Sequence, residues 1–121
     1  MRDHRELAAY QHAHELVLAV HEAVHQIPPG DPNGIAARLE AAALSAAAAV
    51  ARGCAAPDEI FAEQMKEAGQ RLREVGYYVD VVHRLGHIPL GTAVELLEHQ
   101  TLAGVEVAAL TLTPRAGEID H

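Results

Sequence analysis

Large aromatic side chains and cysteine are scarce in this sequence. The 121 residues contain no Trp, one Phe, three Tyr and a single cysteine, Cys54. One cysteine excludes a disulfide framework and every zinc module built on several cysteines. With so few aromatic residues, a hydrophobic core has to be made mainly of Ala, Val and Leu. Such a core is filled only where its elements approach each other closely.

Basic residues are also few. Nine Lys and Arg stand against 17 Asp and Glu, a formal net charge of −8. This is the wrong sign for a general binder of nucleic acid or of anionic membrane surfaces. The first six residues include Arg2, Asp3, Arg5 and Glu6 and form no apolar run, and the most apolar stretch, 41–51, is too short and too rich in Ala to span a bilayer. We therefore expect a soluble, cytoplasmic protein with no membrane partner.

Helix-breaking residues divide the chain into four segments with a helical spacing of apolar residues. Three prolines and two glycines between positions 28 and 34 end the first segment. Gly53 has the place of a C′ glycine, Pro57 fits a first helical turn, and Gly86 ends the third segment. The expected helices cover about 5–26, 34–52, 57–85 and 91–112. Short connections join antiparallel neighbours, so the predicted fold is all-α: an antiparallel up-down-up-down four-helix bundle over 1–113, with a polar C-terminal tail at 114–121.

Each predicted helix has a stripe of apolar residues that we expect to face the core. In the first helix the stripe is Leu7, Tyr10, Ala13, Val17, Val20, Val24 and Ile27. In the second it is Ile35, Leu39, Ala42 or Ala43, Ala46 and Val50. In the third it is Phe61, Met65, Ala68, Leu72, Val75, Tyr78 or Val79, Val82 and Leu85. In the fourth it is Val94, Leu97, Thr101, Val105, Ala108 and Leu112.

The second segment is apolar nearly all round. Its only charges are Arg38, Glu40 and Arg52, and most of its other positions are alanine. The core of a small bundle covers one face of such a helix, so we expect a second subunit to cover the other. Two glycines seven residues apart on the third segment share a face and allow a neighbouring helix to approach. The candidates for a homo-oligomer interface are Ala37, Ala41, Ala48, Gly69 and Gly76.

The nine histidines raise the question of a metal site. Glu22-x-x-His25 and Asp80-x-x-His83 each have the spacing of one half of a carboxylate-bridged di-iron site in a helical bundle. Such a site also needs an inward-facing glutamate on each remaining helix, and the second helix offers only Glu40, near its start. We therefore expect no metal and no cofactor. A metal-binding, di-iron-like bundle that uses Glu22, His25, Asp80 and His83 is the alternative.

Residue patterns typical of catalysis are missing from the sequence. It contains no G-x-S-x-G, Walker A or dinucleotide-binding motif. A lone thiol such as Cys54 is more often structural than reactive. We therefore expect a protein that is not an enzyme.

The basic residues that come closest to a patch lie on the second and third predicted helices. The candidates for contact with nucleic acid are Arg38, Lys66, Arg71 and Arg73. The same surface carries acidic residues at helical spacing, such as Glu67 four residues before Arg71. A solvated face with salt bridges along the helix is therefore the favoured interpretation.

Five phrases occur in an order and spacing that resemble a known family. They are YQHAHEL at 10–16, IP at 27–28, AALS at 42–45 within the segment 39–53, EVGYY at 74–78 and LGHI at 85–88. Together they are similar to the four-helix-bundle proteins first noted as 23S ribosomal RNA intervening-sequence proteins, whose relatives include the accessory variability proteins of diversity-generating retroelements. The resemblance covers about residues 7–112, nearly the whole chain.

This resemblance implies an antiparallel four-helix bundle that assembles into a homopentameric ring and has no known enzymatic activity. In the retroelement branch it also implies binding to nucleic acid and to a reverse transcriptase through a basic surface. The sequence departs from that branch, because Ala49 and Arg52 stand where the family tends to have Asn and Glu, and because its charge is negative. We therefore predict a non-catalytic homo-oligomer, in the form of a pentamer, that acts as an interaction or scaffold protein for a protein or nucleic-acid partner.

Overall fold

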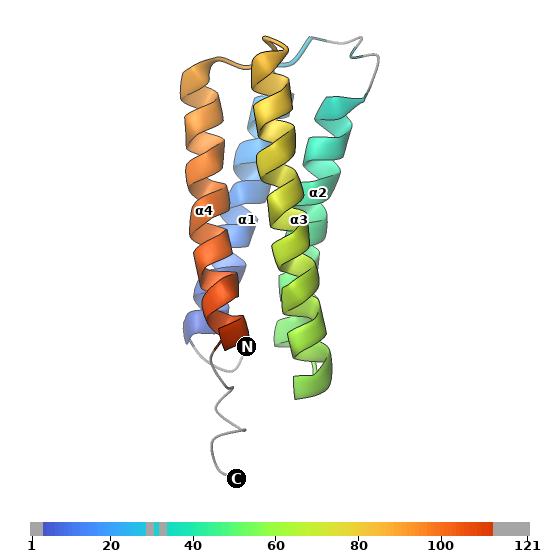
Figure 1. Cartoon of the computed structure of the whole chain (residues 1–121), viewed down its shortest axis with the longest axis vertical. Coiled ribbons are helices and arrows are strands. Elements are labelled where there is room, and N and C mark those ends of the chain that lie inside the picture. Colours follow the sequence, from blue (N-terminus) through green and yellow to red (C-terminus); the bar gives the residue numbers. More distant parts are fainter. Residues whose placement is uncertain (1–3, 29–30, 32–33, 113–121) are drawn as a thin grey trace.

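Four α-helices make up the described part of the chain. The computed structural model describes residues 4–28, 31 and 34–112. The helices are α1 (His4–Val24), α2 (Ile35–Cys54), α3 (Asp58–Arg84) and α4 (Leu90–Leu112), as drawn in Figure 1. Their ends lie within two residues of the ranges predicted from the sequence, and the all-α prediction is confirmed. The predicted polar tail at 114–121 lies outside the described residues.

The ends of the helices are defined by local hydrogen bonds. Before α2, the carboxylate of Asp31 accepts a hydrogen bond of 3.0 Å from the amide of Ala36, so it satisfies a free donor of the first turn. Gly34 adopts the left-handed conformation with φ 64° at the start of that helix. After α3, Gly86 has φ 79°, and the amide of His87 donates to the carbonyl of Val82 over 2.9 Å. This arrangement is the glycine stop that the sequence predicts.

Gly53 does not end α2, and its predicted role as a C′ glycine is wrong. The helix continues to Cys54, and Gly53 is a buried helical residue without a positive φ. A Cβ atom at this position would lie 2.6 Å from Cε of Met65 and 3.0 Å from Cβ of Gln64. The glycine is therefore needed for the close approach of α3 to α2 and not for a turn.

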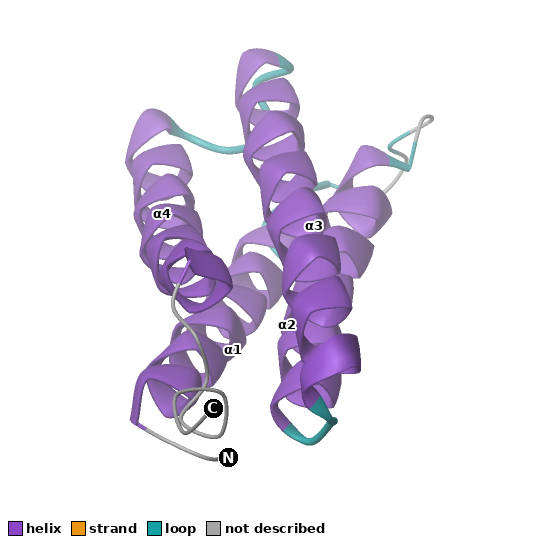
Figure 2. Ribbon diagram, turned by 60° about the horizontal axis from the view of Figure 1, so that its bottom comes forward, coloured by secondary structure: helices purple, strands orange, loops and turns teal. Residues whose placement is uncertain are grey.

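The four helices pack as an antiparallel bundle with α2 and α4 at opposite corners. α1 packs against α2 and α4, and α3 packs against the same two helices. Figure 1 shows α1 beginning and α4 ending at the same end of the bundle, and Figure 2 shows α3 beside α2 and α4 beside α1 in a second view. The outward surfaces of α2 and α4 therefore point away from each other.

The core is made mainly of small and medium-sized aliphatic side chains. The predicted stripes of α2 and α3 are confirmed, with two exceptions: Ile35 is only half-buried and Leu85 is exposed. In α1 the predicted stripe is right for Ala13 and Val20, which are buried. The other buried residues, Glu6, Ala9, Leu16 and Ala23, each lie one position before a predicted residue. Alanines on this face let α1 approach its neighbours closely, while Val17 and Val24 lie half-buried at its edge.

The inner face of α4 differs most from its prediction. The buried residues of α4 are Ala93, Leu96, Ala103, Val107 and Leu110. All six residues of the predicted stripe, from Val94 to Leu112, are exposed. The helix has two apolar stripes about one position apart, and the spacing of the residues does not say which one faces inward. Among the described residues, no helix combines the length and the apolar character needed to cross a membrane.

Candidate functional site

The outward side of α2 is a continuous stripe of small apolar residues. We call it the α2 face, and it consists of Ala37, Ala41, Leu44, Ala48 and Ala51. Their spacings of four and three residues place them on one side of the helix, and all five are exposed. Arg38 and Arg52 lie along the edge of this stripe and are also exposed. The predicted interface residues Ala37, Ala41 and Ala48 thus lie together on one outward surface.

The outward side of α4 is a longer stripe of larger apolar residues. We call it the α4 face, and it consists of Leu90, Val94, Leu97, Thr101, Val105, Ala108 and Leu112. The exposed fraction reaches 64 % for Leu90, 60 % for Val105 and 84 % for Leu112. The charged residues of α4 are Glu95, Glu98 and Glu106, and the helix has no Lys or Arg. The spacing of apolar residues predicted this stripe for the core, and that prediction is wrong. The low charge of α4 is the signal in the sequence that indicates two apolar sides.

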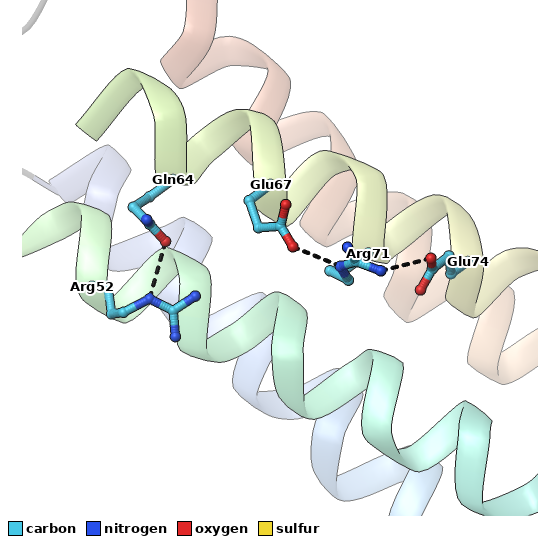
Figure 3. A network of polar contacts seen from close by, with 5 residues as sticks. All are labelled: Arg52, Gln64, Glu67, Arg71 and Glu74. Carbon is cyan, nitrogen blue, oxygen red and sulfur yellow. Dashed lines mark hydrogen bonds and ion pairs between the residues drawn. The ribbon is translucent and has the colours of Figure 1, made fainter. Parts of the chain in front are cut away.

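A groove of about 390 Å³ runs between α2 and α3. Its basic residue on α3, Arg71, donates one hydrogen bond to Glu67 over 2.7 Å and another to Glu74 over 2.6 Å, as Figure 3 shows. These hydrogen bonds, with that to Glu67 the stronger cause, raise the pKa of the Arg71 guanidinium. At the end of the same pair of helices, Arg52 donates to the side-chain carbonyl of Gln64 over 3.0 Å. The charge of Arg71 is therefore matched by carboxylates within its own helix.

A second groove, of about 530 Å³, lies between α3 and α4. Its floor includes Gly69 and Gly104, and a Cβ atom added to either glycine would have no atom within 4 Å. Lys66 and Arg73 line the same groove. Because glycine has no side chain, these two positions leave an open channel beside the α4 face.

The four residues predicted to contact nucleic acid lie in two different places. Arg38 and Arg71 line the groove between α2 and α3, whereas Lys66 and Arg73 line the groove between α3 and α4. Arg71 is paired with two glutamates. The structure therefore does not bring the four residues into one basic patch.

The two glycines predicted at a subunit interface have different surroundings. Gly69 faces the open groove between α3 and α4. Gly76 instead faces Gln100 on α4 of the same chain, and a Cβ atom there would lie 3.4 Å from the side-chain nitrogen of Gln100. The space at Gly76 is thus used within the bundle.

The four candidate metal ligands form separate contacts. Glu22 on α1 is exposed, and Nδ1 of His25, the residue after the end of α1, donates to the carbonyl oxygen of His21 over 2.8 Å. On α3, Asp80 forms an ion pair of 3.0 Å with Arg84. Nδ1 of His83 lies 3.3 Å from the carbonyl oxygen of Ile88. Within the described ranges, no three or more His, Cys, Asp or Glu side chains are grouped so that they could hold a metal ion.

Two further polar features connect α1 to α2. Nδ1 of His21 lies 3.0 Å from a carboxylate oxygen of Glu40, an exposed contact that does not follow from the sequence pattern. Cys54 is buried, with its sulfur 4.0 Å from the carbonyl oxygen of Glu6. The thiol lines neither of the two grooves.

The fold has a known counterpart among solved structures. A protein of unknown function from the S23 ribosomal protein family of Bacteroides thetaiotaomicron VPI-5482 superposes with a TM-score of 0.81. The alignment covers 90 % of this chain and 99 % of the other, at 11 % sequence identity. At that identity the similarity shows a shared four-helix fold. The sequence matches no protein-family model and no curated protein.

Proposed function

We propose that this protein is a non-catalytic homo-oligomeric scaffold that presents a partner-binding surface once assembled. The observation that carries this proposal is the presence of two exposed apolar faces on one small bundle, the α2 face and the α4 face. Contiguous exposed apolar surface on a small protein is typical of an interaction site. Covering these faces with copies of the same chain removes them from water and contributes about 25 cal/mol per Å² of apolar surface.

A ring of five subunits is the assembly that we propose. Its support is the resemblance of the sequence to the 23S ribosomal RNA intervening-sequence proteins, together with the fold shared with a protein from the S23 ribosomal protein family. Two apolar faces at opposite corners of the bundle let one chain contact two neighbours, as a cyclic assembly requires.

A non-catalytic role fits the side chains that line the two grooves. The groove between α2 and α3 holds Arg71 between Glu67 and Glu74, where all three charges are used in ion pairs. The buried thiol of Cys54 lies away from both grooves. We therefore propose that the grooves and apolar faces serve for contacts between proteins.

Light scattering coupled to gel filtration tests the assembly directly. Protein without an affinity tag should elute with about five times the protomer mass of 12.9 kDa. The experiment should cover a range of concentrations, because an assembled chain dissociates on dilution. A mass equal to that of one chain at concentrations of about 10 to 100 µM would contradict the proposal. It would mean that the dissociation constant lies above this range, which corresponds to a binding free energy weaker than about 6 kcal/mol.

A further inference from the structure

We propose that the assembly is built head to tail, with the α4 face of one copy packed onto the α2 face of the next. This inference rests on the proposed self-assembly and names the two surfaces that make the contact. It follows from the shapes of the two faces, from their charges and from their positions on the bundle.

The two faces differ in the size of their side chains. The α4 face presents Leu90, Val94, Leu97 and Val105, whereas the α2 face has alanine at four of its five positions. Alanines on one helix leave room for the larger side chains of a facing helix, and their backbones can then approach closely. Two α2 faces placed together would bury little surface, because each consists mainly of methyl groups.

The charges of the two helices differ, since α4 has only acidic charged residues and α2 has two basic residues and one acidic residue. All three charged residues of α4 are glutamates, Glu95, Glu98 and Glu106. The α2 face is bordered by Arg38 and Arg52 on one side and by Glu40 on the other. A carboxylate oxygen of Glu40 lies 3.0 Å from Nδ1 of His21. Two α4 faces in contact would bring acidic residues of both copies together, which is unfavourable, whereas an α4 face on an α2 face brings glutamates near arginines.

The positions of the faces favour a chain of contacts over a closed pair. α2 and α4 occupy opposite corners of the bundle, so each copy offers its α4 face on one side and its α2 face on the other. A contact between unlike faces leaves one face of each type free in a pair of molecules. Further copies can then be added until the rotation closes a ring.

The size of the contact indicates which neighbouring surface takes part. The α4 face extends over 22 residue steps, or about 33 Å, and is about 10 Å wide. The area of this strip is therefore less than half of the roughly 800 Å² that each partner buries in a specific interface. The groove between α3 and α4 lies directly beside the strip and includes Ala108, which is also part of the α4 face. We therefore place the α4 wall of this groove within the same interface, and leave Lys66 and Arg73 on its α3 wall outside the contact.

Two blocked variants of the full chain test the pairing. In the first, Ala41→Glu and Ala48→Glu place charges on the α2 face; in the second, Leu97→Glu and Val105→Glu place charges on the α4 face. All four positions are exposed, so the bundle itself should keep its helical circular dichroism. Each variant alone should be a monomer in light scattering. An equimolar mixture should give a dimer of twice the protomer mass, because one intact α4 face meets one intact α2 face and no third copy can be added.

Other results would overturn this pairing and leave self-assembly intact. If the α2-blocked variant alone still forms dimers, two α4 faces bind each other and the head-to-tail contact is wrong. If the mixture stays monomeric while the unmodified chain assembles, the two faces are not partners. A monomeric unmodified chain would instead contradict the proposed function itself.

Two controls keep the test specific. Leu18→Glu changes an exposed leucine on α1 to the same charged residue, and it should retain the mass of the unmodified assembly. If it also dissociates the protein, added charge and not the position of the faces is responsible, and the pairing is overturned. If a blocked variant fails to fold, the same four positions changed to Gln supply uncharged versions, for which the mixture must again give the dimer.

Discussion

The side-chain amide of Gln100 on α4 donates a hydrogen bond to the carbonyl oxygen of Leu72 on α3, over 3.2 Å. The amide fits there because Gly76, one helical turn after Leu72, has no side chain. This contact brings a polar residue of α4 towards α3. The buried residues Leu96 and Ala103 lie four before and three after Gln100, on the same side of the helix. This hydrogen bond therefore forms in the orientation of α4 that places the α4 face outward.

This orientation predicts effects of very different size for two adjacent leucines. Leu96 is 1 % exposed and Leu97 is 37 % exposed. Leu96→Ala should lower the free energy of unfolding by about 2 to 5 kcal/mol, because it leaves a cavity in the core. Leu97→Ala should change it by about 1 kcal/mol or less wherever the chain is monomeric. Urea denaturation at several protein concentrations measures both, and a larger loss for Leu97→Ala would show that the inner face of α4 is the other stripe.

Two glycines in helices should respond differently to alanine. Gly69→Ala should stabilise the chain by up to about 1 kcal/mol, since alanine favours the helix and nothing lies near the added methyl group. Gly53→Ala should destabilise it by about 1 to 2 kcal/mol, because the methyl group would press on Met65 and on Cβ of Gln64. Thermal denaturation of both variants measures the difference. If Gly53→Ala is as stable as Gly69→Ala, α3 does not approach α2 as closely as described.

The thiol of Cys54 should be protected in the folded protein. It is 5 % exposed, so a thiol reagent such as dithionitrobenzoate reaches it only after local opening. An opening that costs about 3 kcal/mol would slow the reaction by about 100-fold relative to the unfolded chain. The absorbance of the released thiolate, followed with and without urea, gives the two rates. Equal rates would mean that this end of the bundle is open.

Nucleic acid should bind weakly or not at all. The four candidate basic residues lie in two separate grooves, and Arg71 is paired with two carboxylates. Fluorescence anisotropy with labelled RNA and DNA at about 50 mM salt, where phosphate contacts are strong, should show no saturable binding. If binding occurs, the slope of the logarithm of the binding constant against the logarithm of the salt concentration gives the number of phosphates that the protein contacts. A slope that falls by about two units per bound chain in Lys66→Ser with Arg73→Ser would place a basic site in the groove between α3 and α4.

The class of fold could be predicted because helical spacing and helix-breaking residues are local features. The glycine stop at Gly86 and the buried stripe of α3 follow from short stretches of sequence. The exposed apolar stripe of α2 could also be predicted, since a helix of alanines with only three charges has more apolar surface than one bundle core covers.

The inner faces of α1 and α4 were decided only by the tertiary structure. Both helices have two apolar stripes that differ by about one position, and the period of a helix does not distinguish them. The choice depends on contacts with residues far away in the chain, such as Gln100 with Leu72, and on alanines that let the helices approach. The role of Gly53 is of the same kind, because its neighbours Gln64 and Met65 belong to the next helix.

By itself, the sequence determined that this chain forms four helices with a core poor in aromatic residues, because those properties depend on composition and on local spacing. Only the tertiary structure decided which apolar stripe of α4 is buried and which is exposed, since that depends on how whole helices fit together. This distinction matters for function. The stripe that the sequence assigns to the core is the α4 face, the surface on which the proposed assembly depends.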